Sequence, residues 1–293
     1  MGKVTFTKKQ NDLMRLFKQN KLPRLTVLQG SVRSGKTWIS LILWALWVAS
    51  RPHDYLYMMT AKSLQTLKRN CLLPLQELIG ERNFTFSLSA KEGVIFGRKI
   101  MLEGANDARS ENKIRGITLG GAYCDELTLF PEDFFVMLLS RLSAPGAKLF
   151  ATTNPDTPTH WLKKKYLDNE ALADDLLNIF FGIDDNTTLP ADYVSALKKE
   201  YTGVFYDRYI RGLWTVAEGL IYTMFNKDYH VVPSVPRDYE EYLISCDYGT
   251  LNPTSAGLWG LCEGKWYRVR EYYYDGRKER YQHFNPRAPR GAR

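Results

Sequence analysis

Residues 30–37, near the start of the chain, have the types and spacing that hold a nucleotide phosphate, because they match the pattern G-x-x-x-x-G-K-[ST]. Two glycines let backbone N–H groups curl around phosphate oxygens. Lys36 places its charge on the β- and γ-phosphates, and the Thr37 hydroxyl can ligate Mg²⁺. The sequence therefore predicts an ATP or GTP site, the alternative being a plain glycine-rich turn. The residues expected to bind the phosphates are Gly30, Ser31, Val32, Arg33, Ser34, Gly35, Lys36 and Thr37.

Arg33 is a second cation inside the same loop. A cation at this place can stabilise the charge that develops on a transferring phosphoryl group, as arginine fingers do. A surface arginine, or one that contacts DNA, explains the same residue equally well. Arg33 is therefore a candidate catalytic residue, and both interpretations stay open.

An acidic pair, Asp125 and Glu126, follows the strand-like segment 121–124. At a strand end the first carboxylate can orient a water of Mg²⁺, and the second can activate the attacking water. The segment is less hydrophobic than a typical buried strand, and an Asp-Glu pair alone is common. Downstream of a phosphate loop, however, the pair predicts hydrolysis, since a small-molecule kinase needs no water-activating glutamate.

A polar tripeptide, Thr152, Thr153 and Asn154, ends the next strand-like segment. Polar side chains at that strand end would face the γ-phosphate and could sense its hydrolysis. The alternative is an ordinary strand-ending turn, because Asn-Pro is a strong breaker of regular structure.

The elements that must position these motifs alternate along the first 150 residues. Strands are expected at 25–28, 55–60, 121–124 and 148–152, with hairpins over 84–102. Helices are expected at 38–50, at 63–79 with a bend or restart near Pro74, and at 130–142. This alternation predicts an α/β fold in which helices cover a parallel sheet.

The second half of the chain is more varied. A mostly helical stretch over 158–209 is interrupted by a strand-like segment at 177–183. The domains are expected to be an ATPase domain over 1–211, a hinge over 212–238, a strand-rich segment over 239–276 and a basic tail over 277–293. The tail has no periodicity and is expected to be disordered.

Composition and charge exclude several classes of protein. The net charge is +8, but the tail holds six basic residues and one acidic residue, so the other 276 residues carry only +3. Charge alone is therefore poor support for DNA binding. The longest apolar stretch has about 12 residues, well short of the roughly 20 that a membrane span needs. The N-terminus lacks a signal peptide, which indicates a cytoplasmic protein. The four cysteines lack metal-ligand spacing and are expected to be buried.

Taken together, six stretches in order resemble the large subunit of tailed-phage terminases, in particular the PBSX-like group of phages and prophages of Gram-positive bacteria. They begin with QNDL and GSVRSGKT and continue through NKIRGITLGGAYCDE, FATTNPDTPTHWLKKKYL, LPADYVSALKKEYTGVFYDRYIRGLW with AEGLIYTMF, and ISCDYGTLNPTSAGLWG. The resemblance implies an ASCE-type P-loop NTPase with a RecA-like sheet, followed by the start of an RNase H-like segment. It also implies a motor subunit that hydrolyses ATP to move viral double-stranded DNA into a procapsid.

The resemblance implies roles for matching residues. Gln10 would contact adenine, and Arg33 would be an arginine acting in cis. Asp125 would hold Mg²⁺, and Glu126 would be the catalytic base. The tripeptide at 152–154 would form a coupling motif that links hydrolysis to a domain movement. The implied partners are double-stranded viral DNA, the terminase small subunit, the portal protein and further copies of the chain docked on the portal, in the cytoplasm of the bacterial host and without a membrane.

Asp247 would be the first metal-binding carboxylate of the nuclease domain, with Mg²⁺ or Mn²⁺ as its metal. A two-metal nuclease needs several carboxylates. Glu271 and Asp275 are available, but a strand face explains them as well. We therefore expect an incomplete nuclease without activity. Two further hypotheses stay open: a nucleotide-binding prophage remnant or assembly module, and a P-loop helicase or kinase.

Overall fold

The computed structural model describes residues 6–106, 108–216, 230–233, 237–249 and 253–274. The chain divides into two compact units, Met1–Gly219 and Leu220–Arg293. The expected basic tail lies outside the described residues, as does most of the expected hinge. Within the described part of the chain, no helix combines the length and apolar character needed to cross a membrane.

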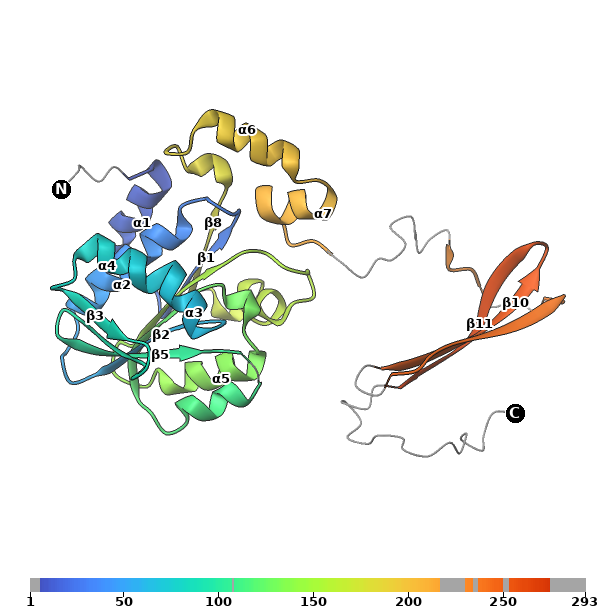
Figure 1. Ribbon diagram of the computed structural model, residues 1–293, viewed down its shortest axis with the longest axis horizontal. Helices are drawn as coiled ribbons and strands as arrows, with labels where there is room; N and C mark the ends of the chain where they lie inside the picture. The colour runs from blue at the N-terminus through green and yellow to red at the C-terminus, as the bar shows by residue number, and fades with distance from the viewer. Residues whose placement is uncertain (1–5, 107, 217–229, 234–236, 250–252, 275–293) are drawn as a thin grey trace. The chain divides into compact units, whose positions relative to one another are not determined.

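The first unit is built on an eight-stranded sheet with the order β3-β4-β5-β2-β6-β7-β1-β8 (Figure 1). The strands from β5 to β8 in this order are parallel, and β3 and β4 form an antiparallel hairpin at the edge. The bounds are β1 (Leu25–Gly30), β2 (Leu56–Ala61), β3 (Phe84–Ser87), β4 (Glu92–Ile95), β5 (Arg98–Gly104), β6 (Leu119–Cys124), β7 (Lys148–Thr153) and β8 (Leu176–Phe181). The predicted helix-covered parallel sheet is confirmed. Strand β7 lies between β1 and β6, as the ASCE arrangement requires.

The packing around strand β6 explains why its sequence is only weakly hydrophobic. All six of its residues are buried, yet two of them are glycines. A Cβ on Gly121 would lie 2.3 Å from the ring of Trp47, and one on Gly120 would lie 2.8 Å from Tyr55. The glycines make room for aromatic side chains of neighbouring elements. The core beside these two positions is therefore filled by those side chains.

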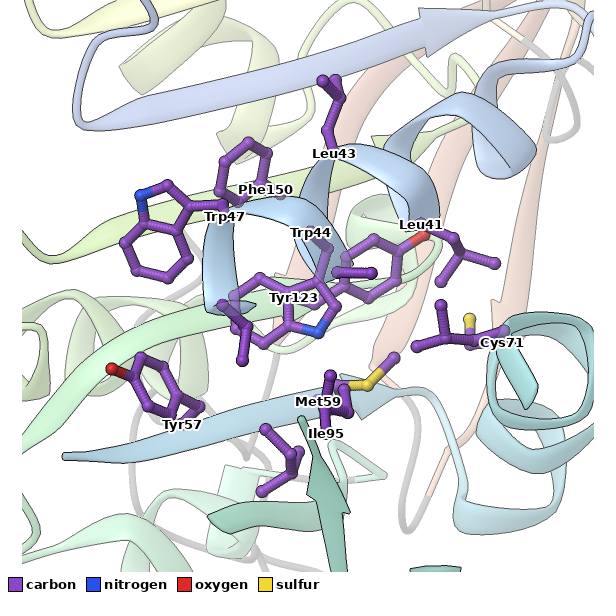
Figure 2. Close-up of a cluster of buried hydrophobic side chains, with 14 of the residues drawn as sticks. Leu41, Leu43, Trp44, Trp47, Tyr57, Met59, Cys71, Ile95, Tyr123 and Phe150 are labelled. Carbon is purple, nitrogen blue, oxygen red and sulfur yellow. The ribbon is translucent and has the colours of Figure 1, made fainter. Parts of the chain in front are cut away.

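Helices cover both faces of the sheet. On one face, Trp44 and Trp47 of α2 (Lys36–Ala49) pack on Tyr57, Tyr123 and Phe150 of the central strands (Figure 2). The Trp44 ring centroid lies 5.7 Å from that of Trp47 and 6.1 Å from that of Phe150. On the other face, α5 (Glu132–Arg141) buries apolar side chains against β1, β6 and β7.

Two helical segments differ from the sequence prediction. Helix α1 (Lys8–Lys18) was not predicted, and a capping box between Thr7 and Gln10 begins it. The helix after β2 is divided into α3 (Leu64–Leu67), a π-helical stretch η1 (Lys68–Leu72) and α4 (Leu73–Ile79). Its interruption therefore precedes Pro74, which lies in the first turn of α4.

The remaining described helical segments are short. They are η2 (Ala108–Ile114), η3 (Leu127–Leu129), η4 (Lys163–Leu167), η5 (Glu170–Leu172), η6 (Ile183–Asp185), α6 (Ala191–Glu200), α7 (Gly203–Phe205) and η7 (Tyr206–Ile210).

The second unit contains a three-stranded antiparallel sheet with the order β11-β10-β9. Its strands are β9 (Glu241–Asp247), β10 (Thr254–Cys262) and β11 (Lys265–Tyr274), which all lie in the segment 239–276 that was predicted to be rich in strands. The prediction of four buried cysteines is wrong for this unit. Cys246 is exposed because it lies in β9, an edge strand with all seven residues exposed, and Cys262, the last residue of β10, is half-buried.

Candidate functional site

The predicted motifs of the first unit meet at one edge of its sheet. The phosphate loop follows β1, the acidic pair follows β6, and the polar tripeptide ends β7. These three strands are adjacent and parallel, so their carboxyl ends lie side by side. Ligands of open α/β sheets bind at such an edge.

The loop over 30–37 has the backbone conformation of a phosphate cradle. Gly30 and Gly35 have φ angles of +140° and +82°. A Cβ on Gly30 would lie 2.0 Å from the Phe181 carbonyl oxygen, so only glycine fits there. The Ser34 hydroxyl is buried and has no hydrogen-bond partner among the described residues. An unpaired buried donor in the cradle fits a bound phosphate oxygen.

Strand β8 and the segment after it support the loop from outside. The Ser31 N–H donates to the Phe181 carbonyl at 2.9 Å, and the Ser31 hydroxyl donates to the Ile210 carbonyl at 2.6 Å. The Val32 N–H donates to the Tyr209 carbonyl at 2.9 Å. Residues far along the chain thus fix the loop before any nucleotide binds.

Lys36, Asn154 and Glu126 form one hydrogen-bonded chain. The Lys36 ammonium donates to Asn154 Oδ1 at 2.6 Å and to the Ser31 carbonyl at 3.0 Å. Asn154 Nδ2 lies 3.0 Å from both carboxylate oxygens of Glu126, and the Asn154 N–H lies 3.3 Å from Oε2. The amide therefore joins the loop cation to the candidate base.

Burial perturbs both charged groups of this chain. Burial raises the pKa of the Glu126 carboxyl above its usual value, although the Lys36 charge opposes the shift. Burial lowers the pKa of Lys36, against the opposing charges of Glu126 and Asp125. A carboxylate with a raised pKa is a stronger general base.

Asp125 is held by both of its oxygens. The Thr152 hydroxyl donates to Oδ1 at 2.7 Å, and Asn70 Nδ2 donates to Oδ2 at 3.1 Å. Only 1% of Asp125 is exposed. A carboxylate and the hydroxyl of Thr37 are hard oxygen donors, so this edge suits Mg²⁺.

The polar tripeptide at 152–154 also contacts the turn after the acidic pair. The Thr153 hydroxyl donates to that of Thr128 at 2.9 Å and accepts the Thr128 N–H at 3.1 Å. The Thr128 hydroxyl donates to the Asn154 carbonyl at 3.2 Å. His160 Nδ1 accepts the Leu162 N–H at 3.1 Å, so its Nε2 donates to the Thr128 carbonyl at 3.1 Å.

Gln10 is buried against the loop, whereas Arg33 is an exposed residue within it. Gln10 Nε2 donates to the Gly35 carbonyl at 3.4 Å, while its Oε1 accepts the Thr7 N–H at 3.0 Å. Arg33 is exposed and has a φ angle of +56°. Asn186 Nδ2 donates to the Arg33 carbonyl at 2.7 Å. The Arg33 side chain has no hydrogen bond or ion pair to any described residue.

Asp247 belongs to the second unit, whereas the other predicted site residues belong to the first. It ends β9 and is exposed. Glu271, the other described candidate, forms an ion pair with Arg268 at 2.8 Å, and Asp275 lies outside the described residues. The described residues contain no group of three or more His, Cys, Asp or Glu side chains that could hold a metal ion.

Sequence reasoning missed three residues that contact the predicted site: Asn70, Thr128 and Asn186. Asn70 and Asn186 reach the site from elements with no motif of their own. Thr128, only two residues after Glu126, could have been found, since a hydroxyl next to an acidic motif is a candidate hydrogen-bond partner.

Comparisons with known proteins agree with this geometry. A family model described as "Terminase large subunit, T4likevirus-type, N-terminal" matches residues 27–227. The large terminase of a thermophilic bacteriophage, solved in complex with ADP, is 40% identical; the match covers 94% of this chain and 70% of that one, with a TM-score of 0.67. The complex of the same terminase with ATP-gamma-S gives 39% identity over 95% of this chain and 70% of that chain, with a TM-score of 0.65.

The large terminase of bacteriophage HK97 is 13% identical over 94% of this chain and 65% of that chain, with a TM-score of 0.52, which supports the fold alone. No match was found among curated proteins. Since the family model spans more than half of the chain and the thermophilic phage protein is 40% identical over most of it, this chain belongs to the terminase large subunit family.

Proposed function

We propose that this chain is the ATPase motor subunit of a phage terminase, which hydrolyses ATP to translocate viral double-stranded DNA into a procapsid. One observation carries the proposal: the phosphate-loop lysine, the acidic pair and the polar tripeptide share one hydrogen-bonded site. The large terminase that was solved both with ADP and with ATP-gamma-S supports nucleotide binding by this chain.

The residues have distinct roles in this proposal. Residues 30–37 bind the phosphates, and Gln10 lies beside the loop where it can contact adenine. Glu126 accepts a proton from the attacking water, which its burial and raised pKa favour. Lys36 stabilises negative charge on the β- and γ-phosphates. Arg33, exposed on the loop, is free to turn toward the same charge.

Mg²⁺ would be held by Thr37 and, through water, by Asp125. Mg²⁺ bound there would neutralise charge on the phosphates. Asp125 is suited to this role because the Thr152 hydroxyl fixes one of its oxygens.

Asn154 connects nucleotide state to the rest of the domain. Lys36 must exchange Asn154 for the phosphates when ATP binds, which releases one end of the amide. The other end stays on Glu126, and the Asn154 carbonyl stays on Thr128. The tripeptide at 152–154 can thereby report the γ-phosphate to the segment around His160.

Membership of the terminase large subunit family supports a proposal of further partners. We propose double-stranded DNA, the portal protein and the terminase small subunit, with several copies of the chain acting together on the portal. The site of action is then the cytoplasm of the bacterial host.

Strands β9–β11 are proposed as the start of an RNase H-like nuclease segment, with Asp247 as its first metal-binding carboxylate. Its place at a strand end and its exposure support this role. Single-site Mn²⁺ binding that Asp247→Ala abolishes would support the proposal. Unchanged Mn²⁺ binding in that variant would refute it.

Lys36→Ala tests the nucleotide site most simply. It should abolish ATP hydrolysis and most ATP binding, because the charge on the β- and γ-phosphates is lost. Lys18→Ala, which removes an exposed lysine at the end of α1, is the matched control and should leave both unchanged. Turnover is measured with and without DNA and portal protein. Wild-type turnover in Lys36→Ala would refute the assignment.

A further inference from the structure

The helix after β2 contains a π-helical stretch, η1, between α3 and α4. A π turn inserts an extra residue into a helix, and such insertions occur frequently at functional sites. Asn70 and Cys71 lie in this stretch. No recognised motif of the chain includes them, yet both lie beside Asp125.

The Asn70 amide is oriented by a bond at each end. Nδ2 donates to Asp125 Oδ2 at 3.1 Å, and Oδ1 accepts the Arg69 Nε–H at 3.2 Å. Since a carboxylate only accepts hydrogen bonds, this orientation of the amide is the one that satisfies both partners. Asp125 is therefore held from two sides, by Thr152 of β7 and by Asn70 of η1.

A series of buried polar groups connects the surroundings of Asp125 to the phosphate loop. The Cys71 side chain is fully buried. Cys71 and Tyr123 belong to the same buried cluster (Figure 2). The Tyr123 hydroxyl lies 2.9 Å from that of Ser40, and Ser40 donates to the Thr37 carbonyl at 2.8 Å. Buried side chains thus connect the surroundings of Asp125 with those of Thr37, the two residues proposed to bind Mg²⁺.

We propose that Asn70 is a positioning residue for the metal site: it holds the Asp125 carboxylate in the orientation that receives Mg²⁺. The inference rests on the proposed function of the phosphate loop. Its physical basis is that groups which hydrogen-bond a metal ligand fix its direction, and their loss typically lowers metal affinity about 10- to 100-fold. Helix η1 thereby becomes part of the nucleotide site.

Asn70→Ala tests this role through binding rather than turnover. ADP affinity is measured by calorimetry over a series of Mg²⁺ concentrations. The Mg²⁺ concentration that gives half of the Mg²⁺-dependent gain in affinity should rise about 10- to 100-fold. ADP affinity without Mg²⁺ should stay unchanged, because Asn70 contacts Asp125 and not the phosphate loop.

Gln76→Ala is the matched control. Gln76 lies on α4 and its amide donates to the Phe84 carbonyl at 3.0 Å, so this variant loses a comparable side chain and bond away from the site. It should leave the Mg²⁺ dependence unchanged. Asn70→Leu, which keeps the volume but removes both bonds, should repeat the shift if Asn70→Ala folds poorly.

Two outcomes refute the role of Asn70: a folded Asn70 variant with wild-type Mg²⁺ dependence, or an equal shift in Gln76→Ala. Failure of the wild-type protein to bind ADP at any Mg²⁺ concentration would instead refute the proposed function of the loop.

Discussion

The Thr152 hydroxyl offers a sharp test of the site, because it joins two functional residues from a fully buried position. It donates to Asp125 Oδ1 at 2.7 Å and accepts the Glu126 N–H at 3.3 Å. Thr152→Val keeps the shape of the side chain and removes both bonds. The Asp125 oxygen and the Glu126 N–H then lose their partner.

The size of the effect follows from these bonds. A hydrogen bond to a charged group contributes about 1.5–3 kcal/mol, so Thr152→Val should lower the free energy of unfolding by about 2 kcal/mol. For a unit of this size that lowers Tm by about 4–8 °C. ATP turnover should also fall, since both acidic residues lose their positioning. Differential scanning calorimetry without nucleotide and a steady-state ATPase assay measure the two effects.

Thr60→Val is the matched control on strand β2, which is separated from β7 by β6. Thr60 is fully buried like Thr152, but its hydroxyl has no hydrogen-bond partner among the described residues. Its replacement should therefore be neutral or stabilising. Equal Tm values for Thr152→Val and the wild-type protein, or equal losses in both variants, would refute the reasoning.

Two further predictions concern Gly30 of the phosphate loop and His160. Gly30→Ala should lower the free energy of unfolding by at least about 1 kcal/mol and weaken ATP binding, because its Cβ would meet the Phe181 carbonyl; wild-type Tm and ATP affinity would contradict this. His160 is held neutral by its two bonds, and burial lowers its pKa below the usual 6.5, although the charge of Asp156 opposes the shift. Its contribution to stability is therefore complete above pH 6.5 and is lost as pH falls through the lowered value. Urea unfolding between about pH 7.5 and 5 should be less pH-dependent in His160→Gln, and equal pH dependence would refute this.

The sequence predicts the central part of the fold because strong local signals coincide there. The pattern over 30–37 requires a strand before it and a helix after it, and the sequence predicts both. Adjacent parallel strands then bring Lys36 and Asp125 to one edge, as expected from their positions after β1 and β6.

Other features depend on distant contacts and leave no local signal. The weak hydrophobicity of β6 is compensated by Trp47, which is far away in sequence. The π turn at η1 puts Asn70 beside Asp125, although the sequence over 63–79 predicts only a helix with a bend or restart near Pro74. Helix α1 is different: Thr7 and Gln10 form a capping box, which is a local signal in the sequence that the prediction overlooked.

Glu126→Gln tests the central claim most directly, because it removes the base and keeps the shape of the side chain. ATP affinity, measured by calorimetry, should stay near the wild-type value, since the residues of the phosphate loop are intact. Steady-state hydrolysis should fall by at least about 100-fold, the loss expected when a general base is removed. Hydrolysis near the wild-type rate would show that another residue is the base, and loss of ATP binding would show that Glu126 serves the structure of the site instead.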